Sequence, residues 1–196
     1  MNARPGGFLS IFLPNRTSES VATVNAAELR DLGIEALLLD LDNTLVPWHG
    51  YEIADSTLEW LRNAESLGFK LCIVSNTRYP GRLKRLAGQL QVPFARGRLK
   101  PLRSAFRPAL DLLGVAPHQT AVIGDQIFTD ILGGNRLGLY TILVRPLSRR
   151  EFFGTRISRL FERIILRAMD KRPDSPAGDA AREQSPGSGS QRKSEQ

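Results

Sequence analysis

Two aspartates come directly after an apolar run in the first quarter of the chain. Residues 37–39 are all leucine, and Asp40 and Asp42 follow them. Side chains two residues apart point the same way in an extended chain. Placing carboxylates at the end of a buried strand costs folding free energy, so their presence there suggests a function. One can attack a phosphorus atom while the other exchanges a proton with the leaving oxygen and with water. The alternative is a simple turn, because Asp-Asn-Thr is also good turn chemistry.

Polar and basic side chains follow the next two apolar runs. Ser75 and Asn76 come after residues 71–74, and a hydroxyl and an amide there can hold a phosphate oxygen. Lys100 follows the run at 92–95, and a fixed ammonium can neutralise a phosphoryl oxygen and the aspartate beside it. Each signal is weak alone, since Ser-Asn suits an ordinary turn and Lys100 lies in a basic segment.

A second pair of acids follows the run at 121–123. Asp125 and Asp130 straddle the junction between a predicted strand and the next helix. Magnesium prefers hard oxygen ligands in octahedral geometry. Asp125, Asp40 and the main-chain oxygen of Asp42 can supply three of them. We expect Asp130 to cap the next helix while also orienting Lys100 or a metal-bound water.

The elements that must position these residues alternate between strand and helix. Apolar runs predict strands at 37–39, 71–74, 92–95, 121–123 and 140–144, and apolar periodicity predicts helices starting near residues 56, 80, 104 and 130. This alternation indicates a doubly wound, Rossmann-like parallel α/β sheet with helices on both faces. In such sheets the ligand lies beyond the carboxyl ends of the strands, where all these polar residues fall.

In this order, the residues resemble the four motifs of haloacid-dehalogenase (HAD) superfamily phosphatases. The motifs are Asp40-x-Asp42-x-Thr44, Ser75, Lys100 and Gly124-Asp125-x-x-x-x-Asp130. The resemblance implies an aspartyl-phosphate on Asp40, acid–base work by Asp42, and phosphate contacts from Ser75 and Lys100. It also implies Mg²⁺ as the cofactor. The expected metal ligands are Asp40, Asp42, Asp125 and Asp130, and the expected substrate-binding residues are Asn43, Thr44, Ser75, Asn76 and Lys100.

The finer pattern is similar to the YqeG-like branch of HAD subfamily IIIA, in which characterised members are phosphatidylglycerophosphatases. It comprises the stretches 39–46, 74–77 and 124–136, the early Phe-Leu-Pro segment and a late arginine-rich segment. Residues 45–55 and 78–91 are too few for a cap domain, so we expect an open, capless site. The resemblance implies hydrolysis of phosphatidylglycerophosphate to phosphatidylglycerol. Two alternatives stay open: a capless phosphatase acting on nucleic-acid ends or phosphoproteins, and a non-catalytic protein that binds anionic surfaces.

We expect four parts: an N-terminal docking segment (1–33), the HAD-like catalytic domain (34–146), a basic amphipathic helix (147–170) and a disordered tail (171–196). In the third part, apolar residues share one helical face and arginines share another. Such a helix can lie on an anionic membrane, or it can pack on the core with its arginines in water. The tail is rich in Ser, Pro, Gly and charged residues and has too few large apolar side chains to order itself.

Composition limits partners and compartment. The net charge of +7 favours anionic partners. We expect a phosphorylated substrate with an anionic lipid headgroup, peripheral membrane contact and no nucleic acid. The sole cysteine, Cys72, lies in an apolar run and fits a buried residue in a reducing compartment. No apolar stretch reaches the roughly 20 residues of a spanning helix. We expect a cytoplasmic enzyme that can lie peripherally on the inner membrane face, with the mitochondrial matrix as the alternative compartment.

Overall fold

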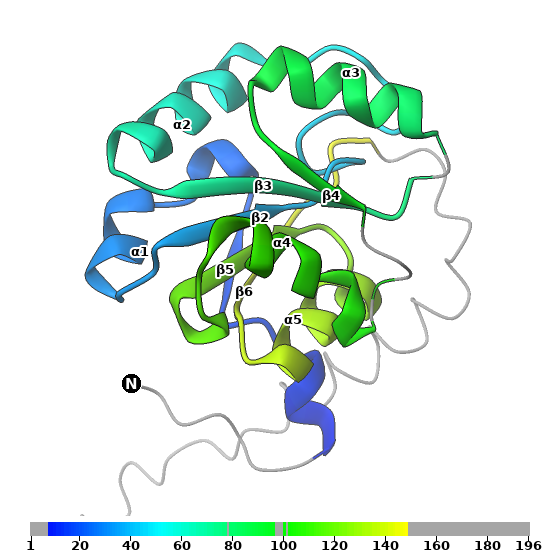
Figure 1. Cartoon of the computed structure of the whole chain (residues 1–196). Coiled ribbons are helices and arrows are strands. Elements are labelled where there is room, and N and C mark those ends of the chain that lie inside the picture. Colours follow the sequence, from blue (N-terminus) through cyan, green and yellow to red (C-terminus); the bar gives the residue numbers. More distant parts are fainter. Residues whose placement is uncertain (1–7, 78, 97–99, 101, 149–196) are drawn as a thin grey trace, which may run out of the picture.

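The computed structural model describes residues 8–77, 79–96, 100 and 102–148 (Figure 1). Six strands form one parallel sheet in the order β1-β6-β5-β2-β3-β4. Their bounds are β1 Arg16–Ser18, β2 Ala36–Leu39, β3 Lys70–Ser75, β4 Phe94–Arg96, β5 Thr120–Gly124 and β6 Tyr140–Val144. The sheet confirms the predicted doubly wound, Rossmann-like α/β fold. The expected C-terminal helix and tail lie outside the described residues, apart from residues 147 and 148.

Helices cover both faces of this sheet (Figure 1). On one face lie α2 and α3, and on the other lie α4 and α5. The α-helices are α1 Ala26–Asp31, α2 Asp55–Ser66, α3 Pro80–Leu90, α4 Arg107–Leu113 and α5 Leu132–Leu137. Short 3₁₀ helices occupy Phe8–Phe12, Val21–Thr23, Arg103–Ala105 and Pro117–Gln119, and a π-helix spans Ile127–Ile131.

The central strands feed two separate cores because their side chains alternate between the two faces. In β2, Leu37 and Leu39 pack with residues of α2 and α3, whereas Leu38 packs with Phe106 and residues of α4. Cys72 of β3 is fully buried on the α4 side, where burial raises the pKa of its thiol to about 11. The thiol therefore stays protonated, as expected of a buried structural cysteine.

No cap domain interrupts the fold at the two places where one could enter. Between β2 and α2 the chain forms only the loop 40–54, and between β3 and β4 it forms α3 with short connections. The described part of the chain therefore leaves the carboxyl edge of the sheet without a second domain over it.

The N-terminal part differs from the sequence-based expectation. Residues 16–18 pair with β6 at the edge of the sheet, and Leu29 of α1 is fully buried in the core, so the sheet begins well before residue 34. The segment Phe8–Phe12 forms a 3₁₀ helix whose Phe12 ring packs 5.7 Å from that of Phe128. The strand Arg-Thr-Ser escaped prediction because it is short, polar and lies at an edge.

Two helix starts also differ from prediction. The expected helix from about residue 104 is divided into a 3₁₀ turn and α4, because Pro108 fits only the first turn of an α-helix. The expected helix from residue 130 begins instead with the π-helix and becomes regular at Leu132. Both differences are at element boundaries, and the elements themselves are present.

Two glycines give a matched test of packing. A Cβ on Gly134 in α5 would lie 2.6 Å from Val122 Cγ1 and 2.8 Å from Thr141 Cγ2, whereas a Cβ on Gly88 in α3 would meet nothing within 4 Å. We predict that Gly134→Ala lowers the free energy of unfolding by about 1–3 kcal/mol through overpacking. Gly88→Ala should raise it by about 0.5–1 kcal/mol because alanine favours the helix. Urea denaturation measures both, and equal effects would contradict this packing.

Candidate active site

The carboxyl ends of β2, β4 and β5 bring Asp40, Lys100 and Asp130 into one buried cluster. Lys100 Nζ lies 2.6 Å from Asp40 Oδ1 and 2.8 Å from Asp130 Oδ1, and its side chain is 1% exposed. Asp40 immediately follows β2, where its N–H donates to the carbonyl of Ile123. The ammonium group of Lys100 thus joins Asp40, 60 positions earlier in the chain, to Asp130, 30 positions later. The cluster lies where the strand pattern places a ligand.

A third carboxylate, Asp125, follows β5 and completes an acidic group. Asp40, Asp125 and Asp130 each offer an oxygen within 4.8 Å of the others, and all three are buried. Asp40 Oδ2 and Asp125 Oδ2 have no hydrogen-bond partner among the described residues. Buried oxygens without partners are costly. A divalent cation that prefers hard oxygen ligands would satisfy Asp125 Oδ2, and the three carboxylates together form a donor set that fits Mg²⁺.

Burial dominates the electrostatics of this group. Desolvation raises the pKa of Asp40 to about 7, against the opposing attraction of Lys100, and raises that of Asp125 to about 8, assisted by the charges of Asp40 and Asp130. For Lys100, burial would lower the pKa, but the charges of Asp130 and Asp40 outweigh burial and raise it. The ammonium is therefore charged, while the raised pKa values of Asp40 and Asp125 favour their protonated forms in the absence of a cation.

Asp130 packs against the backbone at Gly124 and Gln126. Its Oδ2 accepts the N–H of Gln126, 3.3 Å away, and a Cβ on Gly124 would lie 2.3 Å from that oxygen. The expectation that Asp130 caps the following helix is wrong, since α5 begins at Leu132 with Ile131 as its N-cap. The Asp130 carboxylate lies in the π-helix and contacts Lys100, as expected.

Asn76 holds the backbone of Lys100 rather than facing the cluster through a free amide. Its Oδ1 accepts the Lys100 N–H at 3.0 Å, and its Nδ2 donates to the Lys100 carbonyl at 3.4 Å. Both ends of the amide are thus occupied, which gives Asn76 a positioning role that the sequence did not indicate. Ser75 is buried at the end of β3, and its Oγ accepts the N–H of Thr77, which leaves its own O–H free to donate.

Asn43 and Thr44 shape the loop after β2. Asn43 adopts the left-handed conformation (φ 63°), which asparagine tolerates better than most residues. Its Oδ1 accepts the Trp48 N–H at 3.2 Å and the Ser148 hydroxyl at 2.5 Å, so the side chain is engaged within the protein. Thr44 Oγ1 donates to Asp125 Oδ1 at 3.5 Å, beside the acidic group.

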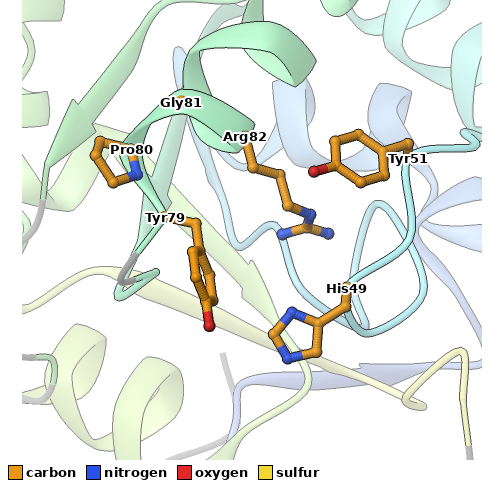
Figure 2. Close-up of a pocket in the computed structure, with 6 residues that line it drawn as sticks. All are labelled: His49, Tyr51, Tyr79, Pro80, Gly81 and Arg82. Atoms are coloured by element: carbon orange, nitrogen blue, oxygen red, sulfur yellow. The ribbon is translucent and has the colours of Figure 1, made fainter.

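Asp42 stands apart from the acidic group and pairs with Arg82 of α3. Arg82 NH1 lies 2.6 Å from Asp42 Oδ1, while its Nε and NH2 both donate to the carbonyl of Gly50. Arg82 is thus a site residue that sequence reasoning missed. In the sequence it occupies an ordinary position in a basic amphipathic helix, and only the folded loop at residue 50 reveals its partner. Figure 2 shows its guanidinium reaching between Tyr51 and His49.

Comparison with known proteins places this geometry in a family. A family model described as HAD-hydrolase-like matches residues 98–146. "Probable phosphatase YqeG" of Bacillus subtilis (strain 168) is 35% identical over 161 residues, which cover 82% of this chain and 93% of that protein. The chain therefore belongs to the YqeG-like branch of the HAD phosphatase superfamily.

More distant relatives extend the comparison. "Phosphatidylglycerophosphate phosphatase 1, chloroplastic/mitochondrial" of Arabidopsis thaliana is 25% identical over 81% of this chain, which spans about half (49%) of that longer protein. A solved structure with a TM-score of 0.52 and 18% identity covers 70% of this chain and 85% of its own length, and it shares the fold. Of these proteins, YqeG is the one that matches nearly end to end.

The clamp by Asn76 generates a prediction about turnover. Asn76→Ala removes both hydrogen bonds to the Lys100 backbone and should lower kcat by roughly tenfold to a hundredfold, because a displaced ammonium stabilises the transferring phosphoryl group poorly. Steady-state assays with para-nitrophenyl phosphate measure this. The exposed Asn63 on α2 supplies the matched control, Asn63→Ala, for which we expect wild-type turnover. Equal kcat in the two variants would refute the positioning role.

The raised pKa values of Asp40 and Asp125 predict a pH dependence of stability. In the metal-free protein, their stabilising contribution is complete below the ordinary aspartate pKa of about 4 and is lost as pH rises through about 7 to 8. Added magnesium needs deprotonated ligands, so its stabilising effect should grow from pH 6 to pH 9. Thermal denaturation with and without magnesium measures both trends.

Substitutions test whether this acidic group, rather than other carboxylates, causes the two pH trends. Asp125→Asn should flatten the decline in metal-free stability and shrink the magnesium effect. The exposed Asp111 on α4 provides the control, since Asp111→Asn should preserve both trends. A magnesium effect that is equally large at pH 6 and pH 9 in the wild-type protein would contradict the prediction.

Proposed function

We propose that this HAD phosphatase hydrolyses a phosphate monoester through an aspartyl-phosphate on Asp40, with Mg²⁺ as its cofactor. The observation that carries the proposal is the state of the Asp40 carboxylate. Lys100 holds Oδ1 at 2.6 Å, while the buried Oδ2 has no partner among the described residues. One oxygen is thus fixed by a cation, and the other is available to attack phosphorus.

In the first step Asp40 Oδ2 forms a bond to phosphorus while the bond from phosphorus to the leaving oxygen breaks. Asp42 gives its proton to that oxygen, and the alcohol departs. Arg82 holds Asp42 through Oδ1, which leaves Oδ2 for the proton. We expect the ammonium of Lys100 and the O–H of Ser75 to bind phosphoryl oxygens as negative charge develops.

In the second step water attacks the aspartyl-phosphate, Asp42 takes a proton from that water, and the bond between Asp40 and phosphorus breaks to release inorganic phosphate. Asp40, Asp125 and Asp130 would hold the magnesium ion, together with the main-chain oxygen of Asp42. When bound, the ion supplies charge neutralisation that keeps Asp40 ionised and lets an anionic phosphate approach it.

For the substrate we propose phosphatidylglycerophosphate, converted to phosphatidylglycerol at the inner membrane face of the cytoplasm. Three features support this: the similarity to the Arabidopsis protein named for that activity, the lack of a cap over the described site, and the net charge of +7. None of the described helices is long and apolar enough to cross a bilayer. Peripheral contact with anionic lipid is therefore the mode of membrane association that we propose.

The test is a substrate panel run with a nucleophile variant. We expect the purified full chain with magnesium to release phosphate from phosphatidylglycerophosphate in mixed micelles faster than from a 3′-phosphorylated oligonucleotide or a phosphopeptide. Asp40→Asn keeps the size of the side chain and removes its nucleophilic charge, so kcat should fall by about a thousandfold or more. Phosphate release is measured colorimetrically.

The outcomes separate mechanism from substrate. Full activity in Asp40→Asn would reject the aspartyl-phosphate mechanism for every substrate. Brisk turnover of the oligonucleotide or phosphopeptide without turnover of the lipid would keep the mechanism and reject the substrate. Vesicle binding with no magnesium-dependent turnover on the whole panel would reject the proposal in favour of an anionic-surface binding protein.

A further inference from the structure

A hollow of about 420 Å³ lies beside Arg82 (Figure 2). It is lined by His49, Tyr51, Tyr79, Pro80, Gly81 and Arg82. These residues come from the loop after β2 and from the start of α3, which are far apart in the sequence. The hollow adjoins the acid–base residue directly, because the Arg82 guanidinium that lines it also contacts Asp42 at 2.6 Å.

The lining of this hollow carries no carboxylate. None of its six residues is an aspartate or glutamate, and Arg82 brings to it a guanidinium that is paired with Asp42. A second cation lies close by: Arg85 stacks over the Tyr51 ring at 5.1 Å, on the same ring that Arg82 approaches at 5.6 Å. Stacking of this kind holds guanidinium groups in fixed orientations. The hollow is therefore suited to an anion rather than to an apolar chain.

Hydrogen-bond donors remain available for such an anion. A guanidinium carries five N–H groups, and the contacts of Arg82 with Gly50 and Asp42 use three of them. Among the described residues, no hydrogen bond engages the hydroxyl of Tyr51 or Tyr79. Arginine matches the geometry of phosphate oxygens, and phenolic hydroxyls can add neutral donors.

We infer that this hollow is a subsite for a second phosphate group, a phosphodiester carried by the alcohol that leaves during catalysis. The inference rests on the proposed role of Asp42, because the leaving oxygen must meet that residue and the rest of the alcohol must then lie beyond it. Arg82 joins the two functions, since one guanidinium positions Asp42 and faces the hollow. A substrate with a terminal monoester and an internal phosphodiester would engage both ends of this arrangement.

Two soluble probes test the subsite without a membrane. Glycerophosphoglycerol phosphate carries both the terminal monoester and the phosphodiester, whereas glycerol 3-phosphate carries the monoester alone. The measured quantity is the ratio of their kcat/KM values. For the wild-type chain with magnesium we expect this ratio to exceed about ten, the equivalent of one charge-assisted hydrogen-bond pair.

Substitutions then test which residues favour the diester-bearing probe over glycerol 3-phosphate. Arg82→Lys should lower kcat for both probes, because the contact with Asp42 changes, and should also lower the ratio by roughly tenfold through a higher KM for the diester-bearing probe. Arg85→Gln, which does not touch Asp42, should lower the ratio by roughly threefold. Leu112→Ala, at an exposed position on α4, is the control and should preserve both kinetic constants.

The outcomes are distinguishable. A ratio near one in the wild type, or a ratio unchanged by both arginine substitutions, would overturn the subsite while leaving the phosphatase mechanism intact. Equal loss of activity on both probes in Arg82→Lys, with no change in ratio there or in Arg85→Gln, would assign Arg82 a positioning role alone and reject the subsite. Failure of the wild type to hydrolyse either probe or para-nitrophenyl phosphate would overturn the proposed function and the subsite together.

Discussion

The buried ammonium of Lys100 is the interaction on which the rest of the site depends. It lies between Asp40 and Asp130 and joins the ends of two different strands to the loop that follows a third. Without it, three buried carboxylates would lie close together with no cation between them, where each charge is costly. Asn76 fixes the lysine backbone, and Gly124 leaves room for the Asp130 carboxylate beneath it. Much of the surrounding chain thus serves to hold one cation in place.

The residues of the cluster could be predicted because they come after predicted strands, Asp40 and Asp125 directly and Lys100 and Asp130 a few residues later. Apolar runs locate strands well, and parallel strands place their carboxyl ends together, so Asp40, Lys100 and Asp125 had to meet. The sequence could not specify which side-chain atoms would face the substrate. Asn76 and Asn43 were expected to bind it, which stays a prediction, but the hydrogen bonds of Asn76 to the Lys100 backbone and of Asn43 Oδ1 to Trp48 and Ser148 could not be foreseen. Side-chain partners depend on loop conformation, which periodicity does not encode.

Arg82 is a site residue that the sequence pattern did not indicate, because its partner also depends on a loop conformation. Its helix was predicted correctly, but an arginine on a basic amphipathic helix gives no sign that it will be buried. Its guanidinium donates to the carbonyl of Gly50, which lies on a loop where Asn43 and His49 adopt the left-handed backbone conformation. The edge strand at 16–18 was missed for a related reason, since its pairing with β6 gives it order that its own composition lacks.

The contacts of Asn43 also fix the position of the last residues that the structure describes. The Leu147 N–H donates to the Asn43 carbonyl and the Ser148 hydroxyl to its side chain, so residues 147 and 148 are held against the loop that carries Asp40 and Asp42. The described chain consequently ends beside the loop that carries Asp40 and Asp42, so a change in the position of residues 147 and 148 would act first on Asn43.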